Sequence, residues 1–287
     1  MNSSSIPNPS FFPKIEDIAR EAGALLISHF GKVEIEYKGE VDLVTKADRE
    51  AEKLIVERVR AAWPGHDITG EEGTRTQSGS DYRWYIDPLD GTTNFAHGYP
   101  VFCVSIAVEH KGDLLAGVIF DPTRNEVFSA EHGAGATLNG RAIHVSKTAT
   151  LAEALVATGF PSHKRHKNPN IHFYHQITLK SHGVRRAGSA ALDLAYTACG
   201  RYDAYWEFKL NPWDTAAGVL LVREAGGRVT YIRGEPFEIA SKEVLATNGL
   251  LHEEIMREMA AIMDAGNEGR GLEPLPDPAD YARTRLK

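Results

Sequence analysis

The sequence predicts an α+β protein with two lobes in one domain. Strand patterns joined by tight turns fill residues 101–142 after a helix-rich start, whereas strands and helices alternate from about residue 151 onward. With 287 residues, 42% of them hydrophobic, the chain is long enough to bury a large core. We therefore expect a single domain over 14–265, with lobe one at 14–148 and lobe two at 149–265.

Lobe one begins with two amphipathic helices. Apolar residues recur at helical spacing from Ile15 to Phe30, and again from Ala47 to a stop before Pro64. The alternating run at 33–37 predicts a strand between them. Further strands are expected at 66–69, 84–86, 101–109, 114–120 and 126–131, with an Asn-Gly hairpin turn at 139–140. Lobe one is therefore expected to be an antiparallel sheet flanked by helices.

Lobe two shows the alternation that is typical of α/β structure. We expect strands at 154–158, 184–186, 203–207, 228–232 and 244–247, and helices at 170–181, 189–198, 213–225 and 250–264. The segments 1–13 and 266–287 are rich in proline, glycine or polar residues and are expected to be flexible tails.

Charge and composition exclude several classes of partner. The net charge is −7 and no long basic run is present, which argues against nucleic-acid binding. Only Cys103 and Cys199 occur, too few for a disulfide framework. The apolar runs are too short to span a membrane, and residues 1–13 lack the pattern of a signal peptide. We expect a cytoplasmic protein whose partner is a small molecule.

Four acidic residues stand where ordered segments begin or end: Glu71, Asp87, Asp90 and Asp214. Two carboxylates about 4 Å apart repel by roughly 4 kcal/mol at an effective dielectric of about 20. Divalent cations such as Mg²⁺ reverse that repulsion and take oxygen ligands. The glycine-led start of a helix after Asp90 offers free N–H groups to a phosphate. The pattern therefore predicts metal-dependent phosphoryl chemistry, although Asp214 taken alone also fits an acid in the first turn of a helix.

Four motifs in order carry a resemblance to a known family. DPLDGTTNF at 87–95 and NPWDTAAG at 211–218, the latter followed by EAGG at 224–227, resemble the two signatures of the inositol monophosphatase family. VDLVTKAD at 41–48 and GEEG at 70–73 are similar to two further blocks. The resemblance covers roughly residues 15–262. It implies a layered α-β-α-β-α sandwich of the inositol monophosphatase and fructose-1,6-bisphosphatase type.

The resemblance also implies a set of metal ligands and catalytic residues. Glu71, Asp87 and the Leu89 carbonyl would bind one Mg²⁺, while Asp87, Asp90 and Asp214 would bind a second. A third Mg²⁺ would lie near Glu71. Each active site would therefore bind two or three Mg²⁺ ions. Asp48 and Thr92 would orient and deprotonate the attacking water, with Glu71 as a further catalytic residue.

Substrate contacts follow from the same resemblance. Phosphate oxygens would meet the N–H groups of Gly91 and Thr92, and the rest of the substrate would meet Gly188, Ser189, Ala190, Glu207, Asp214 and Lys38. Asp193 falls where relatives carry a polar residue on the same helix. Simpler interpretations stay open: a helix cap for Ser189, a solvent-facing strand end for Glu207, and surface positions for Lys38 and Asp193.

The implied activity is Mg²⁺-dependent hydrolysis of a phosphate monoester, first of all myo-inositol monophosphate, by direct in-line attack of water. The resemblance further implies inhibition by lithium and a homodimer. Fructose 1,6-bisphosphate or another sugar or nucleotide phosphate is the alternative substrate. An alternative of another class is a catalytically silent, metal-stabilised interaction protein.

Two other interpretations have testable weaknesses. Haloacid-dehalogenase phosphatases use the first Asp of Asp-x-Asp-Gly-Thr as a covalent nucleophile, but Asp87 and Asp90 are one residue further apart than that motif requires. The histidines at positions 163, 166, 172 and 175 suggest zinc, but no cysteine or carboxylate pattern accompanies them.

Overall fold

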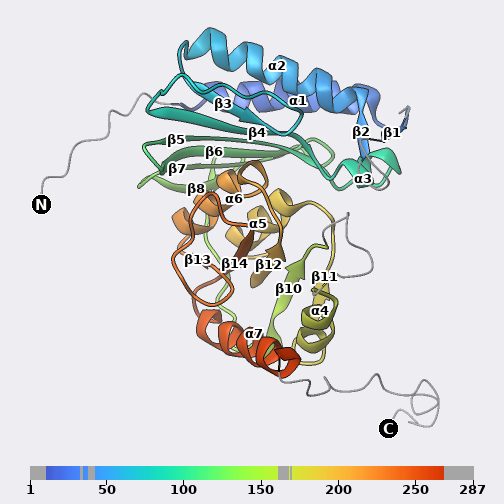
Figure 1. Cartoon of the computed structure of the whole chain (residues 1–287), viewed down its shortest axis with the longest axis vertical. Helices are drawn as coiled ribbons and strands as arrows, with labels where there is room; N and C mark the ends of the chain where they lie inside the picture. Colours follow the sequence, from blue (N-terminus) through green and yellow to red (C-terminus); the bar gives the residue numbers. More distant parts are fainter. Residues whose placement is uncertain (1–10, 33–34, 38–42, 161–167, 169, 268–287) are drawn as a thin grey trace, which may run out of the picture.

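Five alternating layers of helices and strands build the molecule (Figure 1). The computed structural model describes residues 11–32, 35–37, 43–160, 168 and 170–267. From one end to the other lie helices α1 and α2, a seven-stranded sheet, helices α5 and α6, a five-stranded sheet, and helices α4 and α7. The expected α-β-α-β-α sandwich is therefore confirmed. The tail at 268–287, most of the tail at 1–13, and Lys38 lie outside the described residues.

The outer helices α1 (Lys14–His29) and α2 (Lys46–Ala62) form because each carries an apolar stripe at helical spacing. In α1 the stripe includes Ile15, Ile18 and Leu26, all of them buried. It packs with α2 on the outer face of the seven-stranded sheet. No helix in the described part of the chain is long and apolar enough to cross a membrane.

The seven-stranded sheet has the order β3-β4-β5-β6-β7-β8-β9. Its strands are β3 (Asp67–Gly70), β4 (Tyr82–Asp90), β5 (Cys103–His110), β6 (Asp113–Asp121), β7 (Glu126–Glu131), β8 (Gly135–Leu138) and β9 (Arg141–Ile143). Asn139 and Gly140 take φ values of 50° and 73° in the expected hairpin turn. Contrary to the expected all-antiparallel sheet, β3 runs parallel to β4, because the chain between Gly70 and Tyr82 returns to the starting edge before β4 begins.

A two-stranded pair, β1 (Ile35–Tyr37) and β2 (Leu43–Thr45), and the short helix α3 (Thr92–Ala96) complete this half of the molecule. Strand β2 was not expected from the sequence.

The five-stranded sheet has the order β11-β10-β12-β14-β13. Its strands are β10 (Leu155–Thr158), β11 (Gly183–Arg185), β12 (Ala204–Phe208), β13 (Arg228–Thr230) and β14 (Glu243–Thr247). The sheet is mixed: β10 pairs in parallel with β11 and β12, whereas β14 is antiparallel to both its neighbours. A 3-10 turn, η1 (Leu151–Glu153), precedes β10. The outer face of this sheet is covered by α4 (Asn170–Thr178) and α7 (His252–Asn267).

The middle layer, α5 (Ala190–Ala198) and α6 (Pro212–Glu224), lies between the two sheets. Every residue of α5 is buried. Two glycines permit the close packing: a Cβ on Gly218 would lie 2.4 Å from Leu194 Cβ, and one on Gly117 would lie 2.8 Å from Ala217 Cα. Each half contributes one sheet, and the strands change sheet between Ile143 and Leu155. The lobe boundary at 148–149 as a division between folding units stays a prediction.

Candidate active site

A bulge at the end of β4 places two carboxylates on one face of the sheet. Asp87 pairs with Ser105 of β5 and Asp90 pairs with Cys103, so three steps on β4 oppose two on β5. In a regular strand, residues three apart face opposite sides, but one extra residue restores the same side. Ser105 and Cys103 both face the middle layer, where Ser105 Oγ donates to the Trp213 carbonyl at 3.4 Å. Asp87 and Asp90 therefore both face α5 and α6.

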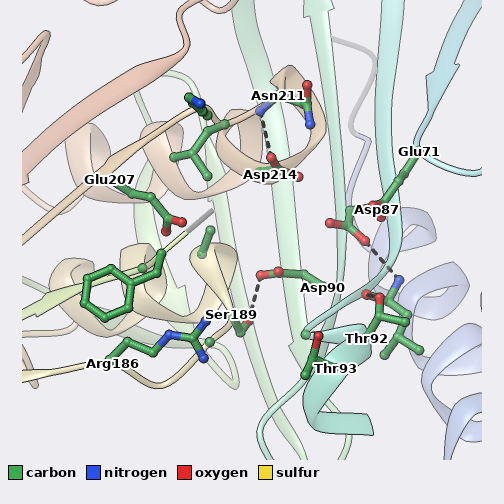
Figure 2. A pocket seen from close by; sticks show the side chains of 18 of the residues that line it. Glu71, Asp87, Asp90, Thr92, Thr93, Arg186, Ser189, Glu207, Asn211 and Asp214 are labelled. Carbon is green, nitrogen blue, oxygen red and sulfur yellow. Dashed lines mark hydrogen bonds between the residues drawn. The ribbon is translucent and has the colours of Figure 1, made fainter. Parts of the chain in front are cut away.

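These carboxylates lie in a pocket of about 300 Å³ between the two halves of the molecule (Figure 2). Most residues that the sequence nominated line it: Glu71, Asp87, Leu89, Asp90, Gly91, Thr92, Gly188, Ser189, Ala190, Glu207 and Asp214. Lining residues that the sequence did not single out are Thr93, Gly159, Phe160, Arg186, Phe208, Lys209, Leu210 and Asn211. Arg186 stands two residues before the nominated segment 188–190, which was the only available signal for it.

Asp48 lies behind the pocket wall and reaches it through Thr92. Asp48 is 1% exposed and accepts a hydrogen bond from Thr92 Oγ1 at 3.2 Å. The same hydroxyl lies 3.0 Å from the Leu89 carbonyl oxygen, a second acceptor. A hydroxyl has one proton, so Thr92 can donate to only one of them at a time and keeps its lone pairs for a donor in the pocket.

Asp90 connects the end of β4 with the start of α5. Its Oδ2 accepts from Ser189 Oγ at 2.7 Å and from the Ala191 N–H at 2.7 Å. Ser189 also caps α5 by accepting from the Leu192 N–H at 3.3 Å. The helix-cap interpretation of Ser189 is therefore correct, and it coexists with a place in the pocket.

Asp214 has a structural partner too. It is the third residue of α6 and accepts from the Asn211 N–H at 2.7 Å, which forms a capping box at the helix start. The first-turn role expected for a lone acid is present. The pocket nevertheless includes Asp214, so the cap fixes one carboxylate oxygen while the side chain lies in the pocket wall.

Burial and mutual repulsion raise the pKa values of these acids. For Asp87 the largest cause is burial, followed by the charges of Glu71, Asp90 and Asp214. Burial also raises the pKa of Asp90 against the opposing hydrogen bonds from Ser189 and Ala191. Burial and the charge of Glu71 raise the pKa of Asp214. The cluster thus strongly favours anything that supplies positive charge, whether protons or cations.

Carboxylates and a backbone carbonyl are the oxygen donors that Mg²⁺ prefers, so the donor set fits a hard divalent cation. Across the described residues, no three His, Cys, Asp or Glu side chains are already drawn together as a metal-binding group. The four acids line the walls of one pocket. His172 and His175 lie on α4, on the far side of the second sheet, away from this pocket.

Glu207 and Asp193 are buried, so the surface interpretations of both are wrong. Glu207 is 9% exposed and accepts a hydrogen bond from the Tyr205 hydroxyl. Burial first, and then the charge of Asp90, raises the pKa of Glu207 to about 7, against the lowering effects of Tyr205 and Arg186. Asp193 is 1% exposed, and neither carboxylate oxygen has a hydrogen-bond partner. Sequence could not show this, because α5 is buried on all sides and has no polar face.

The layered fold, with an acidic pocket between its halves and a helix start in the pocket wall, fits the class of phosphatases. The model of the inositol monophosphatase family matches residues 11–264. The chain belongs to the inositol monophosphatase family, and it is a phosphatase as the sequence predicted.

Three known proteins illustrate the similarity. An inositol-1-monophosphatase of Synechocystis is 46% identical over 263 residues, covering 88% of this chain and 91% of the relative. A Nus factor SuhB of Pseudomonas aeruginosa is 46% identical over 239 residues, covering 80% and 88%. The solved structure of inositol monophosphatase from Anabaena has a TM-score of 0.78 at 43% identity, covering 85% of this chain and 93% of that one.

Proposed function

We propose that the protein hydrolyses a phosphate monoester with Mg²⁺, and that myo-inositol monophosphate is its substrate. The observation that carries the proposal is the convergence of Glu71, Asp87, Asp90 and Asp214, from three segments of the chain, on one pocket. When bound, Mg²⁺ would neutralise these acids, polarise the phosphoryl oxygens and lower the pKa of a water. Glu71, Asp87 and the Leu89 carbonyl would hold one ion, and Asp87, Asp90 and Asp214 a second.

A third ion would lie near Glu71, which lines the pocket with the other three acids. Glu71 is half-buried, whereas Asp87 is 2% exposed. We propose that Glu71 both holds a cation and orients water in the pocket.

Asp48 and Thr92 would remove a proton from the attacking water. The Thr92 hydroxyl donates to Asp48, so its oxygen lone pairs can accept a hydrogen bond from a water in the pocket. As the water attacks phosphorus, its proton passes to Thr92 Oγ1 while the Thr92 proton passes to the Asp48 carboxylate. The water oxygen ends in the phosphate, and the ester oxygen takes a proton from solvent as it leaves as an alcohol. Asp48 afterwards returns its proton to solvent, so no covalent enzyme intermediate is required.

The phosphate itself would lie at the start of α3. Gly91 takes a φ of 99°, a conformation that suits glycine, and so turns the chain from β4 into the helix. A Cβ there would lie 2.8 Å from the Val101 carbonyl oxygen. The first N–H groups of a helix lack partners within the helix, so those of Gly91 and Thr92 suit phosphate oxygens.

The opposite wall would bind the alcohol part of the substrate. Glu207 and Ser189 can accept hydrogen bonds from ring hydroxyls, and the Gly188–Ala190 backbone closes that side. The names of the relatives support inositol monophosphate as the substrate. Lys38 keeps its proposed contact near the phosphate from the sequence alone. A cytoplasmic homodimer inhibited by lithium stays part of the proposal on the family resemblance.

A substrate panel with Mg²⁺ tests the proposal. The candidates are inositol 1-phosphate, fructose 1,6-bisphosphate, phosphoadenosine phosphate, NADP and histidinol phosphate. We expect the largest kcat/KM for inositol 1-phosphate and no turnover with EDTA. A larger value for another ester would replace the substrate but keep the chemistry. Single-turnover hydrolysis in ¹⁸O-water should label phosphate only; label in Asp87 would contradict direct attack.

One observation favours a second candidate of another class. The 46% identical Pseudomonas relative is named a Nus factor, so an interaction role is compatible with this sequence. The intact set of Asp48, Glu71, Asp87, Asp90 and Asp214 argues that catalysis is retained. Failure of the whole panel at saturating Mg²⁺ would favour the interaction protein.

A further inference from the structure

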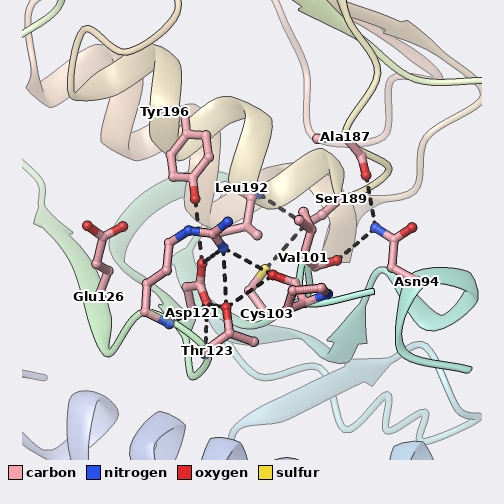
Figure 3. A network of polar contacts seen from close by, with 12 residues as sticks. Asn94, Val101, Cys103, Asp121, Thr123, Glu126, Ala187, Ser189, Leu192 and Tyr196 are labelled. Atoms are coloured by element: carbon pink, nitrogen blue, oxygen red, sulfur yellow. Dashed lines mark hydrogen bonds and ion pairs between the residues drawn. The ribbon is translucent and has the colours of Figure 1, made fainter. Parts of the chain in front are cut away.

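Asn94 lies at the junction of the two halves but outside the pocket. It is on α3, two residues after Thr92, and is 8% exposed. Its side-chain Nδ2 contacts the backbone carbonyl oxygens of Val101 at 2.7 Å and Ala187 at 2.9 Å (Figure 3). It also lies 3.3 Å from the carbonyl oxygen of Gly188. Only the amide nitrogen can face three acceptors, so the orientation of this side chain is defined by its neighbours.

The three contacts come from both sides of the pocket. Val101 precedes β5 in the first half, whereas Ala187 and Gly188 belong to the segment between β11 and α5 in the second half. An amide nitrogen has two protons, so one can remain with Val101 and the other is shared between Ala187 and Gly188. Asn94 therefore connects the phosphate end of the pocket with the segment that leads into Ser189.

The conformation of Gly188 also reflects its close approach to the Asn94 side chain. It has a φ of 87°, and a Cβ there would lie 3.2 Å from Asn94 Nδ2 and 3.3 Å from Asn94 Oδ1. The backbone of 187–188 thus lies against the amide with no room for a side chain between them. The next residue, Ser189, donates to Asp90 at 2.7 Å, and the Ala191 N–H does the same.

We infer that Asn94 is a positioning residue that holds the 187–191 segment in register with the start of α3, so that one substrate can contact both walls of the pocket. The inference rests on the proposed function for its consequence in catalysis. Asn94 touches no reacting atom. It acts through Gly188 and Ser189, whose distance from Gly91 and Thr92 sets the length of substrate that fits.

The test compares two esters in the full-length protein with Mg²⁺. Inositol 1-phosphate needs both walls, whereas para-nitrophenyl phosphate offers a flat aryl group with no hydroxyls for Ser189 or Glu207. We expect Asn94→Ala to lower kcat/KM for inositol 1-phosphate roughly fivefold more than for the aryl ester, mainly through KM, as loss of one such hydrogen bond implies. Asn94→Asp should increase that ratio further, because a carboxylate facing three carbonyl oxygens repels them.

Asn248→Ala is the matched control. Asn248 is 4% exposed, and its Nδ2 donates to Ser146 Oγ at 2.9 Å and to the Thr148 carbonyl at 2.8 Å; none of these residues lines the pocket. It should lower the melting temperature at least as much as Asn94→Ala does, but leave the ratio of the two esters unchanged. Equal losses on both esters for Asn94→Ala would overturn the inference.

A readout without catalysis separates this inference from the proposed function. Amide hydrogen exchange should become faster at residues 187–192 in Asn94→Ala and not in Asn248→Ala. If the wild-type protein hydrolyses neither ester, the proposed function fails, yet faster exchange at 187–192 would still establish the structural connection. Unchanged exchange there would refute it.

Discussion

Asp90 differs from the other pocket acids because it bridges the two halves of the molecule. Its Oδ2 is occupied by Ser189 and Ala191, while Asp214 has its Oδ2 on Asn211. Each carboxylate therefore uses one oxygen for the fold and can use the other for a cation. This division explains how acids that repel one another remain in place: neutral donors hold each of them separately.

Asp90→Asn should lower kcat by at least roughly a hundredfold at saturating Mg²⁺, since it removes one charge from the proposed cation site while it keeps the shape. Asp203→Asn is a suitable control, because Asp203 is a nearly buried carboxylate that accepts from Ser146 and Leu155 outside the pocket. Asp203→Asn should lower the free energy of unfolding but leave the kcat of the folded protein close to that of the wild type. Steady-state kinetics checks both, and near-normal turnover of Asp90→Asn would remove Asp90 from the site.

Thr92 offers a sharper test of the proton path. Thr92→Val keeps the shape but removes the hydroxyl that donates to Asp48, so kcat should fall roughly a hundredfold, whereas Thr92→Ser should lose much less. Since Val is β-branched like Thr, backbone effects are small. Comparable losses in the two variants would mean that packing, and not the hydroxyl, is what matters.

At the scale of elements, hydrogen bonds through His252 connect the start of α7 with Thr230 and Thr247 of the five-stranded sheet. Thr247 Oγ1 accepts from the Gly249 N–H and Thr230 Oγ1 donates to the Tyr231 carbonyl. Because Thr230 has already given its one proton to Tyr231, it accepts from His252 Nε2–H at 2.9 Å, and the Nδ1 of a neutral ring accepts from Thr247, also at 2.9 Å. A neutral imidazole with its proton on Nε2 therefore satisfies every partner in this chain of hydrogen bonds.

This chain predicts that stability depends on pH. Burial, and then Arg228, lowers the pKa of His252 to about 4 from 6.5, so the unfolded chain binds the proton more readily. The contribution of His252 to the free energy of unfolding is fully present above about pH 6.5. It is lost as the pH falls toward 4, by about 1–2 kcal/mol after solvent screening. Urea unfolding between pH 7 and 4.5 measures it. His252→Gln should lack this component of the slope, and an identical slope would contradict the assignment.

The elements also show how far sequence reasoning reaches. Helix α1 was predicted to within a residue at each end, because its apolar spacing and its end are local properties. The parallel pairing of β3 with β4 was missed, because pairing depends on contacts distant in sequence. The bulge that aligns Asp87 with Asp90 was invisible for the same reason. Helix α4 ends at Thr178, three residues before the expected end, because periodicity alone does not define a helix end.

The candidate site divides in the same way. The sequence indicated its acids, because carboxylates at the ends of ordered segments and a glycine-led helix start are patterns that can be seen locally in a sequence. Asn94 and Arg186 received no role, although both stand inside or beside quoted motifs, because their importance comes from the opposite half of the molecule. Asp193 could be recognised as buried only once α5 was placed between two sheets.

At the scale of the whole molecule, the site forms because the packing of the middle layer places the first residues of α5 and α6 beside the end of β4. The packing of α6 on the sheet depends on Gly117 of β6, because α6 lies too close to β6 for a side chain at this position. A Cβ on Gly117 would lie 2.8 Å from Ala217 Cα. Since Ala217 is in the same helix as Asp214, any shift of α6 away from the sheet moves a pocket carboxylate.

Gly117→Ala should therefore reduce both stability and activity. Overpacking costs about 1–3 kcal/mol, or a melting temperature lower by roughly 3–10 °C. Displacement of Asp214 should lower kcat/KM roughly ten- to a hundredfold. Differential scanning calorimetry and kinetics well below the melting transition measure the two effects separately.

Gly23→Ala is the matched control for Gly117→Ala, because it overpacks the opposite face of the same strand. A Cβ on Gly23 would lie 2.4 Å from Phe120 Cε1, between α1 and β6 and away from the middle layer. We expect a similar loss of melting temperature with kcat/KM within about twofold of wild type, since surface layers and site are separated by the sheet. If both variants lose activity in proportion to stability, general softening and not the position of α6 controls the pocket. If only Gly117→Ala does so, the packing of the middle layer sets the geometry of the four acids.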